Sequence, residues 1–168
     1  PAYDAKDQSA DLWIVPVDGS QPPRQLTRTK APESGVEWSA DSTRVAFVTK
    51  REGDDVAQIY TIEVARGGEA ERVTSLSTGA RAPRWSPDGA KLLFVSEVFP
   101  GAKDDDANKK AAKALKDRKY NARVYEGFPI KYWDRWLDER KPHLFVQDAQ
   151  PGAKPRDLFA GTQFAAQA

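Results

Sequence analysis

The chain lacks two residue types and almost lacks a third. Its 168 residues include no cysteine, no methionine and one histidine, His143. Without cysteine there are no disulfides and no thiolate metal ligands, but the compartment, periplasmic or cytoplasmic, stays open. A lone histidine is a poor ligand set, so we expect no metal and no cofactor. No apolar run approaches the roughly 20 residues of a membrane-spanning helix, so we expect a soluble chain without a membrane partner.

An excess of charge of one sign is lacking as well. The 26 Lys and Arg residues against 25 Asp and Glu leave a net charge of +1, which gives no support to a nucleic-acid partner. Apolar residues make up 39% of the chain and include five tryptophans, which is enough for a core. Because no methionine is present and the chain starts at Pro1, we expect a piece of a longer protein.

One pattern occurs twice. Residues 85–95 begin Trp-Ser-Pro-Asp-Gly, and residues 38–48, which lie 47 positions earlier, begin Trp-Ser-Ala-Asp-Ser. In each copy an aromatic residue ends a short strand, a Ser-x-Asp turn reverses the chain, and a basic residue precedes an apolar run. This is the pattern of a β-hairpin. A fixed period of this length is typical of repeat architectures.

The flanking segments repeat too. Strands are expected at 11–17, before an Asp-Gly turn signal, and at 24–27. Shifted by 47 positions, the first of these strands falls on 58–64 and the second covers 72–74. A third copy begins at His143, displaced by 85 positions from the second, which indicates an insertion of 38 residues between Glu97 and His143.

Four strands in a repeat of 40 to 50 residues are what one blade of a β-propeller needs. The sequence therefore predicts an all-β fold: a partial β-propeller of about two and a half four-stranded blades, with a helical, aromatic-rich insertion in the last blade. We assign residues 1–168 to one incomplete propeller domain. Its parts are a half blade at 11–27, a blade at 36–74, and a blade at 83–159 with the insertion at 98–142. So few blades cannot close a ring, which also indicates a fragment.

The residues of the repeated turns have a structural interpretation. Asp41 and Asp88 are expected to accept hydrogen bonds from nearby backbone N–H groups, not to act as catalytic carboxylates. Gly89 supplies the positive φ that such a hairpin favours. Ser42, at the equivalent place, implies either strain or a slightly different turn.

Two tryptophans and the histidine are interpreted in the same way. Trp38 and Trp85 are expected to pack between blades. His143 begins a strand and has no nucleophile at a known spacing. We interpret it as a histidine at the solvent edge or one with satisfied hydrogen bonds, with a functional role as the alternative.

The insertion is where the repeat stops and where we expect specificity. Residues 107–119 are good helix formers that follow three aspartates and end in basic residues, which complements the helix dipole. The apolar stripe is thin, so this helix is expected to lean lightly on a neighbour or to swing out. Beyond it, six aromatic residues fall within seventeen positions, and Trp133, Trp136 and Leu137 have the spacing of one helical face. These aromatics either anchor the insertion or line a cavity.

Together these features carry a resemblance. The Trp-Ser-Pro-Asp-Gly hairpin, the Leu-Trp and Ile-Tyr strands, the Arg-Gln-Leu-Thr strand end and the insertion over 132–146 resemble the N-terminal propeller of bacterial prolyl oligopeptidase-family serine peptidases. Within that family, they are most similar to the dipeptidyl aminopeptidase and acylaminoacyl-peptidase branch. The chain departs at Ala40 and Ser42, where the family hairpin favours Pro and Gly. The hairpin alone is shared with the propeller of the Tol translocation system.

The resemblance implies an enzyme whose catalysis lies elsewhere. In this family a propeller caps an α/β-hydrolase domain, whose Ser, Asp and His carry out acyl transfer, and it restricts access to short peptides. The chain has no Gly-x-Ser-x-Gly sequence and one histidine, so no catalytic residue can be carried over. The implied partners are the remainder of the propeller, an α/β-hydrolase domain on the parent chain, and short peptides. The implied role is that of a substrate gate and cavity wall.

In exopeptidases of this family, carboxylates on the propeller side hold the free amino terminus of the substrate. By type and place, the candidate substrate-binding residues are Asp134, Asp138, Glu139, Trp133 and Trp136. Alternatively, the acids are surface ion pairs with Arg135, Arg140 or Lys141. Two other classes stay open: a protein-binding propeller of the Tol-system type without enzymatic activity, and a ligand-binding sensor.

Overall fold

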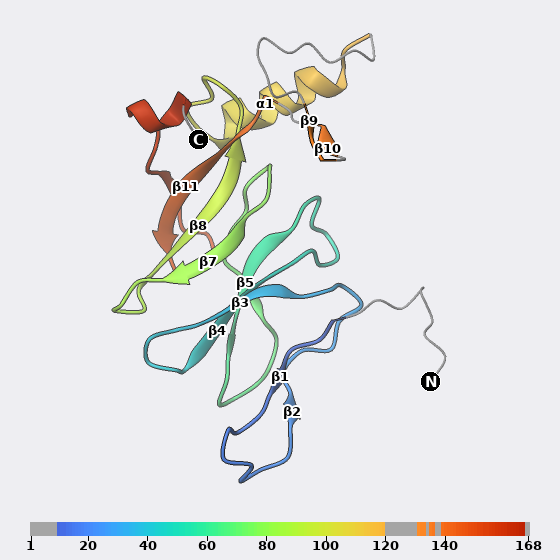
Figure 1. The fold of residues 1–168 in the computed structure, drawn as a ribbon, viewed down its shortest axis with the longest axis vertical. Helices are drawn as coiled ribbons and strands as arrows, with labels where there is room; N and C mark the ends of the chain where they lie inside the picture. Colours follow the sequence, from blue (N-terminus) through green and yellow to red (C-terminus); the bar gives the residue numbers. More distant parts are fainter. Residues whose placement is uncertain (1–9, 120–130, 134, 137–138, 167–168) are drawn as a thin grey trace.

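A computed structural model of the chain describes residues 10–119, 131–133, 135–136 and 139–166 (Figure 1). Two four-stranded antiparallel sheets dominate it. In blade one the order is β3 (Ser34–Trp38), β4 (Arg44–Thr49), β5 (Gln58–Glu63) and β6 (Glu71–Arg72). In blade two the order is β7 (Arg81–Trp85), β8 (Lys91–Val98), β11 (Lys141–Asp148) and β12 (Arg156–Asp157).

Smaller elements flank the two blades. A hairpin of β1 (Trp13–Ile14) and β2 (Arg24–Gln25) precedes blade one. Helix α1 (Asp105–Lys116) and the hairpin of β9 (Lys131–Tyr132) and β10 (Arg135–Trp136) lie between β8 and β11 in sequence. A 3₁₀ turn, η1 (Gln163–Ala166), follows β12. Successive strands of each blade pair with one another, so the fold is the all-β partial propeller that the repeat predicted.

One backbone contact shows the repeat directly. In each copy the residue after the fourth strand donates its N–H to a carbonyl of the third strand or, in the first copy, of the residue just before it. The pairs are Leu26 to Leu12 at 2.8 Å, Val73 to Ile59 at 2.9 Å and Leu158 to Leu144 at 2.8 Å. Equivalent residues therefore occupy equivalent places in all three copies.

The first strands of the two blades share an irregularity. The pairing register shifts between Ser34 and Glu37 in β3 and between Arg81 and Arg84 in β7, which marks a β-bulge in each strand. These strands form one edge of their sheets, and they contact each other across the gap between blades.

The main core lies between the two blades. Alternate residues of each sheet face it, as expected for strands with a side-chain period of two. Blade one contributes Ala46, Val48 and Ile59, and blade two contributes Leu92, Phe94 and Phe145. The rings of Phe94 and Phe145 stack with centroids 5.8 Å apart.

A second cluster covers the opposite face of blade one. It consists of Val45, Phe47, Tyr60, Ile62 and Ala70, with Leu12 from the β1 region packed against it. Blade one is therefore buried on both faces.

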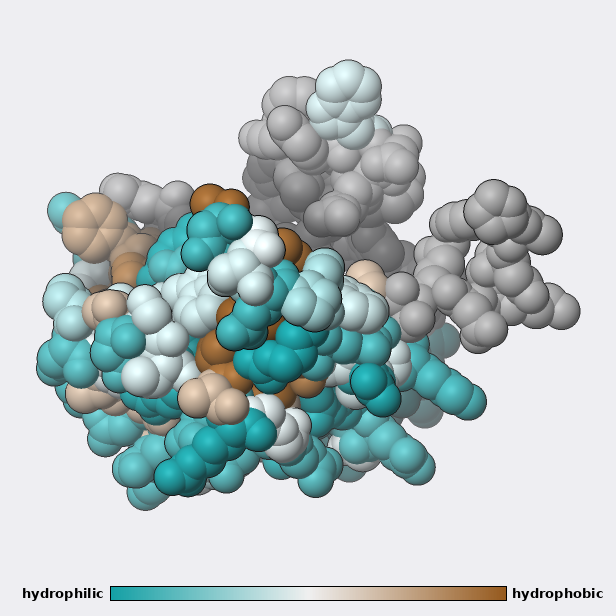
Figure 2. Space-filling view, turned by 90° about the horizontal axis from the view of Figure 1, so that it is seen from below, coloured by the Kyte–Doolittle hydropathy of each residue, from teal (hydrophilic) through white to brown (hydrophobic). Residues whose placement is uncertain are grey.

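Seen from below, the molecule is mostly hydrophilic, and a small group of hydrophobic atoms is exposed near the centre of the view (Figure 2). Of the helices within the described ranges, none is long and apolar enough to cross a membrane.

Two sequence predictions need correction. The strand expected at 11–17 is ordered as a strand only at Trp13–Ile14, and Val15 and Val17 are exposed. Its partner β2 is also two residues long, which limits the ladder. The helical spacing of Trp133 and Trp136 is misleading, because these residues belong to the β9–β10 hairpin and Trp133 has a φ of +56°. Aromatic residues favour strands over helices, which accounts for this outcome.

Candidate functional site

Arg44 joins the two blades. From the start of β4, its guanidinium lies 4.5 Å from the ring centroid of Trp85 and donates to the carbonyls of Gly89 at 2.6 Å and Ala149 at 3.5 Å. The Trp85 indole in turn donates to the Glu37 carbonyl at 3.1 Å. A cation that is stacked on an indole and hydrogen-bonded to two carbonyls links the start of β4 to blade two. We call this group of contacts the interblade clamp.

The same contacts test the packing expected of the two tryptophans. Trp85 lies between the blades, as predicted, and packs against the main core. Trp38, its equivalent in blade one, is 44% exposed. An ion pair between Arg84 and Glu37, 2.8 Å long, adds a contact between β7 and β3. Both side chains of this pair are accessible to water, so the pair contributes little stability.

The two repeated turns use the same hydrogen bonds. The carboxylate of Asp41 accepts from the Ser39 hydroxyl at 2.6 Å and from the Thr43 N–H at 3.1 Å. The Ser39 hydrogen bond, followed by that of Thr43, lowers the pKa of Asp41 from 3.8 to about 2. Each acceptor contact favours the charged form of the acid. Ser42 has a φ of +58°, so this turn keeps the left-handed backbone conformation and carries its strain.

In blade two, the Ser86 hydroxyl and the Ala90 N–H donate to Asp88 in the same way. The Ser86 contact, followed by that of Ala90, lowers the pKa of Asp88 below its ordinary value. Gly89 holds the corresponding backbone position at a φ of +66°. With these contacts, both aspartates are part of the turns themselves.

His143 is buried and fully engaged. Its Nδ1 lies 2.6 Å from the Asp157 carboxylate, its Nε2 lies 3.4 Å from the Ala165 carbonyl, and its ring packs against Phe159. It is 5% exposed, so it is a satisfied histidine and not one at the solvent edge. It holds β12 and η1 against β11, and no serine or cysteine nucleophile is among these partners.

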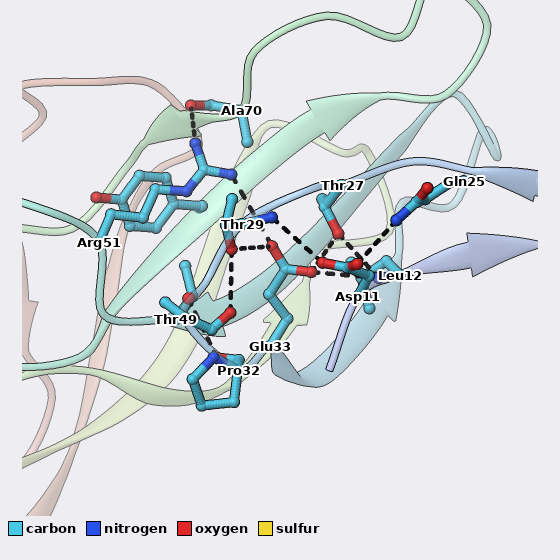
Figure 3. A network of polar contacts seen from close by, with 12 residues as sticks. Asp11, Leu12, Gln25, Thr27, Thr29, Pro32, Glu33, Thr49, Arg51 and Ala70 are labelled. Carbon is cyan, nitrogen blue, oxygen red and sulfur yellow. Dashed lines mark hydrogen bonds and ion pairs between the residues drawn. The ribbon is translucent and has the colours of Figure 1, made fainter. Parts of the chain in front are cut away.

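A buried carboxylate attaches the β1–β2 hairpin to blade one (Figure 3). The Glu33 side chain is fully buried, accepts hydrogen bonds from the Leu12 N–H at 3.2 Å and from the Thr27 hydroxyl, and lies 4.0 Å from Arg51. Thr29 also donates to it, at 3.4 Å. The repeat does not reveal Glu33, because the residue 47 positions later is an alanine. Its donors satisfy the buried charge, which makes it a structural group.

Helix α1 rests on blade two through polar contacts. The Asp104 carboxylate caps the helix by accepting from the Ala107 N–H at 2.8 Å. Asp105 accepts from the Ser77 hydroxyl at 2.8 Å, and the buried Asn108 accepts from the Phe99 N–H at 2.8 Å. The sequence predicted a helix that leans lightly on a neighbour or swings out, and these polar contacts hold its first turns against the residues that precede β7 and follow β8. The signal in the sequence that could have indicated this buried contact is Asn108 itself, an asparagine inside the helix and close to its start.

The candidate substrate-binding residues have mixed outcomes. Asp134 and Asp138 lie outside the described residues. Trp133 is 86% exposed at the turn between β9 and β10, and Trp136 pairs through its backbone with Lys131. Glu139 is exposed and lies 3.7 Å from Arg118, so an arginine other than the expected ones pairs with it. Within the described ranges, no group of three or more His, Cys, Asp or Glu side chains could hold a metal ion.

With this geometry established, comparison with known proteins points to peptidases. The chain is 34% identical over 103 residues to the uncharacterized peptidase YuxL of Bacillus subtilis, covering 60% of this chain and 15% of that protein. It is 28% identical over 168 residues to dipeptidyl-peptidase 5 of Porphyromonas gingivalis, covering 99% of this chain and 23% of that protein. The chain thus spans less than a quarter of the length of either relative. No protein-family model matches it.

Solved structures agree on the fold. The acylaminoacyl peptidase of Pyrococcus horikoshii superposes with a TM-score of 0.56 at 17% identity, over 88% of this chain and 20% of that one. A protein assigned as TolB from Agrobacterium tumefaciens superposes with a TM-score of 0.52 at 25% identity, over 90% of this chain and 43% of that one. The chain is therefore similar in sequence to peptidases, and its fold is found in both peptidases and a TolB-type protein.

Proposed function

We propose that the chain is the non-catalytic propeller part of a serine peptidase that hydrolyses short peptides by dipeptidyl or acylaminoacyl release. The observation that carries this proposal is the 28% identity to dipeptidyl-peptidase 5, which extends over 99% of the chain. The burial of His143, with no serine or cysteine among the partners described for it, supports a non-catalytic role for this part.

In this proposal the chain is one incomplete propeller domain, divided as the repeat indicates. Its partners are the remainder of the propeller and an α/β-hydrolase domain on the same parent polypeptide. The domain gates access: the interblade clamp holds the sheets at a fixed angle, and the contacting edge strands β3 and β7 form part of the cavity wall. A rigid wall admits short peptides and excludes folded or long ones.

The gating proposal is tested in the full-length polypeptide with Arg44→Met. This variant removes the three clamp contacts of Arg44 but keeps an unbranched side chain. We expect hydrolysis of a long peptide to rise relative to that of a dipeptide substrate, with the dipeptide rate unchanged. Arg66→Met, which removes an exposed arginine whose ion pair is with its near neighbour Glu63, is the matched control. If the ratio of long-peptide to dipeptide hydrolysis is the same in both variants and in the unmodified protein, the chain is not a gate.

Recognition of the substrate amino terminus is assigned to Asp134, Asp138 and Glu139, with Trp133 and Trp136 as wall residues. The exposure of Trp133 and of the Glu139 carboxylate supports this, since both are available to a ligand. A charge-assisted hydrogen bond to an ammonium group is strong enough to discriminate it from an acylated amine.

This assignment has a matched control in the chain. Glu139 and Glu63 are both exposed acids with an arginine at 3.7 Å and 3.6 Å. Glu139→Gln, together with Asp134→Asn and Asp138→Asn, is assayed on a free-amine dipeptide substrate and on its acylated counterpart. For at least one of them we expect KM to rise about tenfold for the free amine only, as loss of a charged hydrogen bond predicts. Glu63→Gln should change neither. Equal effects on both substrates would refute the assignment.

A protein-binding propeller without enzymatic activity is the second candidate. The structural similarity to the TolB-type protein, at the higher identity of 25%, favours it. One measurement on the full-length polypeptide distinguishes the two candidate functions. A peptidase hydrolyses a dipeptide substrate and loses this activity on treatment with a serine-directed inhibitor, whereas a protein-binding propeller does not hydrolyse it.

A further inference from the structure

Each copy of the repeat has a polar residue at one place near the start of its third strand. Asp11, Gln58 and His143 share this place, at the displacements of 47 and 85 positions. In the first copy, Asp11 accepts from the Gln25 amide at 2.8 Å and from the Thr29 N–H at 3.2 Å. Its side chain therefore ties the third strand to the fourth strand and to the residues that follow it.

Blade one makes the same connection with an amide. The Oε1 of Gln58 accepts from the Thr74 hydroxyl at 2.8 Å and from the Leu76 N–H at 3.3 Å, and its Nε2 donates to the Leu76 carbonyl at 2.8 Å. Leu76 is the equivalent of Thr29 in the first copy. Because an amide side chain does not titrate, this connection in blade one does not depend on pH.

Blade two has a histidine at this place, and both of its ring nitrogens face acceptors. The Nδ1 of His143 lies 2.6 Å from the Asp157 carboxylate, and its Nε2 lies 3.4 Å from the Ala165 carbonyl. The same carboxylate accepts from the N–H groups of Phe159 at 2.8 Å and Ala160 at 3.2 Å, so it is an acceptor toward the ring as well. An imidazole makes hydrogen bonds to two acceptors only when both of its nitrogens carry a proton.

The other groups around the ring do not supply a second switch. Among the described residues, β8 places Ser96 opposite His143, and η1 has no titratable side chain. A small hollow beside Asp157 has three further charged residues in its lining, which are Lys103, Asp104 and Asp105. Asp104 caps α1 and Asp105 accepts from Ser77, so both carboxylates already have donors. Of these side-chain types, only histidine ordinarily changes its charge between about pH 5 and 8.

We propose that His143 is a pH-sensitive latch for the segment after β12, residues 158–166. At low pH the imidazolium donates to both Asp157 and Ala165, and η1 is held against blade two. When one proton leaves, Nδ1 keeps the other because its partner is a carboxylate, and Nε2 then presents a lone pair to the Ala165 carbonyl. The closed form binds one proton more than the open form, so its stability falls as the pH rises. The latch is independent of the proposed peptidase function.

Hydrogen exchange of the full-length polypeptide, followed by mass spectrometry, tests the latch. The N–H groups of Thr162 and Ala165 donate within the segment, so their protection reports whether it is closed. We expect the protection factor of residues 158–166 to fall about tenfold or more between pH 5 and pH 8, as loss of a charged hydrogen bond predicts. Residues 73–81, the equivalent segment of blade one, are the internal control and should keep the same protection factor.

Two variants separate the latch from an ordinary structural contact. His143→Gln places the neutral amide of blade one in blade two, so the protection factor of residues 158–166 should be the same at both pH values. Asp157→Asn has the same expected result for a different reason, because its amide donates to Nδ1 and the neutral ring then keeps a proton on Nε2 for Ala165. The proposal is overturned if the unmodified protein shows no change between pH 5 and pH 8, or if the change persists in His143→Gln.

Discussion

Blade one and blade two carry the same four-strand pattern but differ in what covers their faces and in where the cation of the second strand bonds. Both faces of blade one are buried, one by blade two and the other with the help of the β1–β2 hairpin. In the part of the chain that the structure describes, one face of blade two is buried and the other is half-buried, and Lys91 stays within its own sheet where Arg44 crosses to a neighbour. The comparison teaches that one position of the repeat can bond to a neighbouring blade or within its own sheet, depending on what lies beside it.

The largest effect is expected where the two blades are alike. Phe47 and Phe94 are equivalent residues with 0% exposure, although they belong to different clusters. Truncation of either to alanine should lower the free energy of unfolding by about 3–5 kcal/mol, as for other buried phenylalanines. Urea unfolding followed by tryptophan fluorescence measures both. Phe164→Ala, at a 49% exposed residue, is the control and should cost far less. A much smaller cost at Phe47 would show that the first face of blade one is not sealed.

The next effect separates the blades. Arg44→Met should cost about 1–2 kcal/mol, because it removes charged hydrogen bonds and a stacked cation. Lys91→Met should cost less than about 1 kcal/mol, because it removes only an exposed ion pair. The same unfolding measurement applies. Equal costs would mean that the clamp adds nothing to the stability of the chain.

A smaller effect of opposite sign is expected in the turns. Ser42 holds a φ of +58° that glycine adopts without strain. Relief of about 1–2 kcal/mol of strain, less the greater backbone entropy that glycine loses on folding, predicts a net stabilisation of about 0.5–1 kcal/mol for Ser42→Gly. Gly89→Ser should destabilise by a similar amount. A rise in Tm for the first variant and a fall for the second would confirm that both turns use one conformation. Destabilisation by Ser42→Gly would contradict it.

The smallest effect concerns pH. The Ser39 hydroxyl is the main cause that lowers the pKa of Asp41 to about 2 from 3.8. The pKa of Asp41 is lower in the folded state than in the unfolded state. Its contribution to the free energy of unfolding is therefore complete above pH 3.8 and is lost as the pH falls from there through about 2. Carboxyl carbon NMR should record this titration, and Ser39→Ala should move it toward 3.8. If Asp41 titrates with the ordinary pKa of 3.8 in the unmodified protein, the turn geometry is refuted.

Much of the fold was predictable because the signals are local. The Ser-x-Asp turns and the helix that follows three aspartates each lie within a few neighbouring positions, and the 47-residue period is found by comparing the chain with itself. The β9–β10 hairpin was not predicted, because the i, i+3 spacing of Trp133 and Trp136 also fits a helix. The contact of Asn108 with Phe99 could not be predicted, since it depends on where the insertion meets the blade.

The sequence by itself determined the repeat, the turns and which residues of each strand share a face, because these follow from backbone geometry and side-chain alternation. Only the tertiary structure decided that Arg44 and Lys91, which share one place in the repeat, have different partners. The physical reason is that a long cationic side chain bonds to whatever acceptors its surroundings supply, and those acceptors belong to another blade, far away in the sequence.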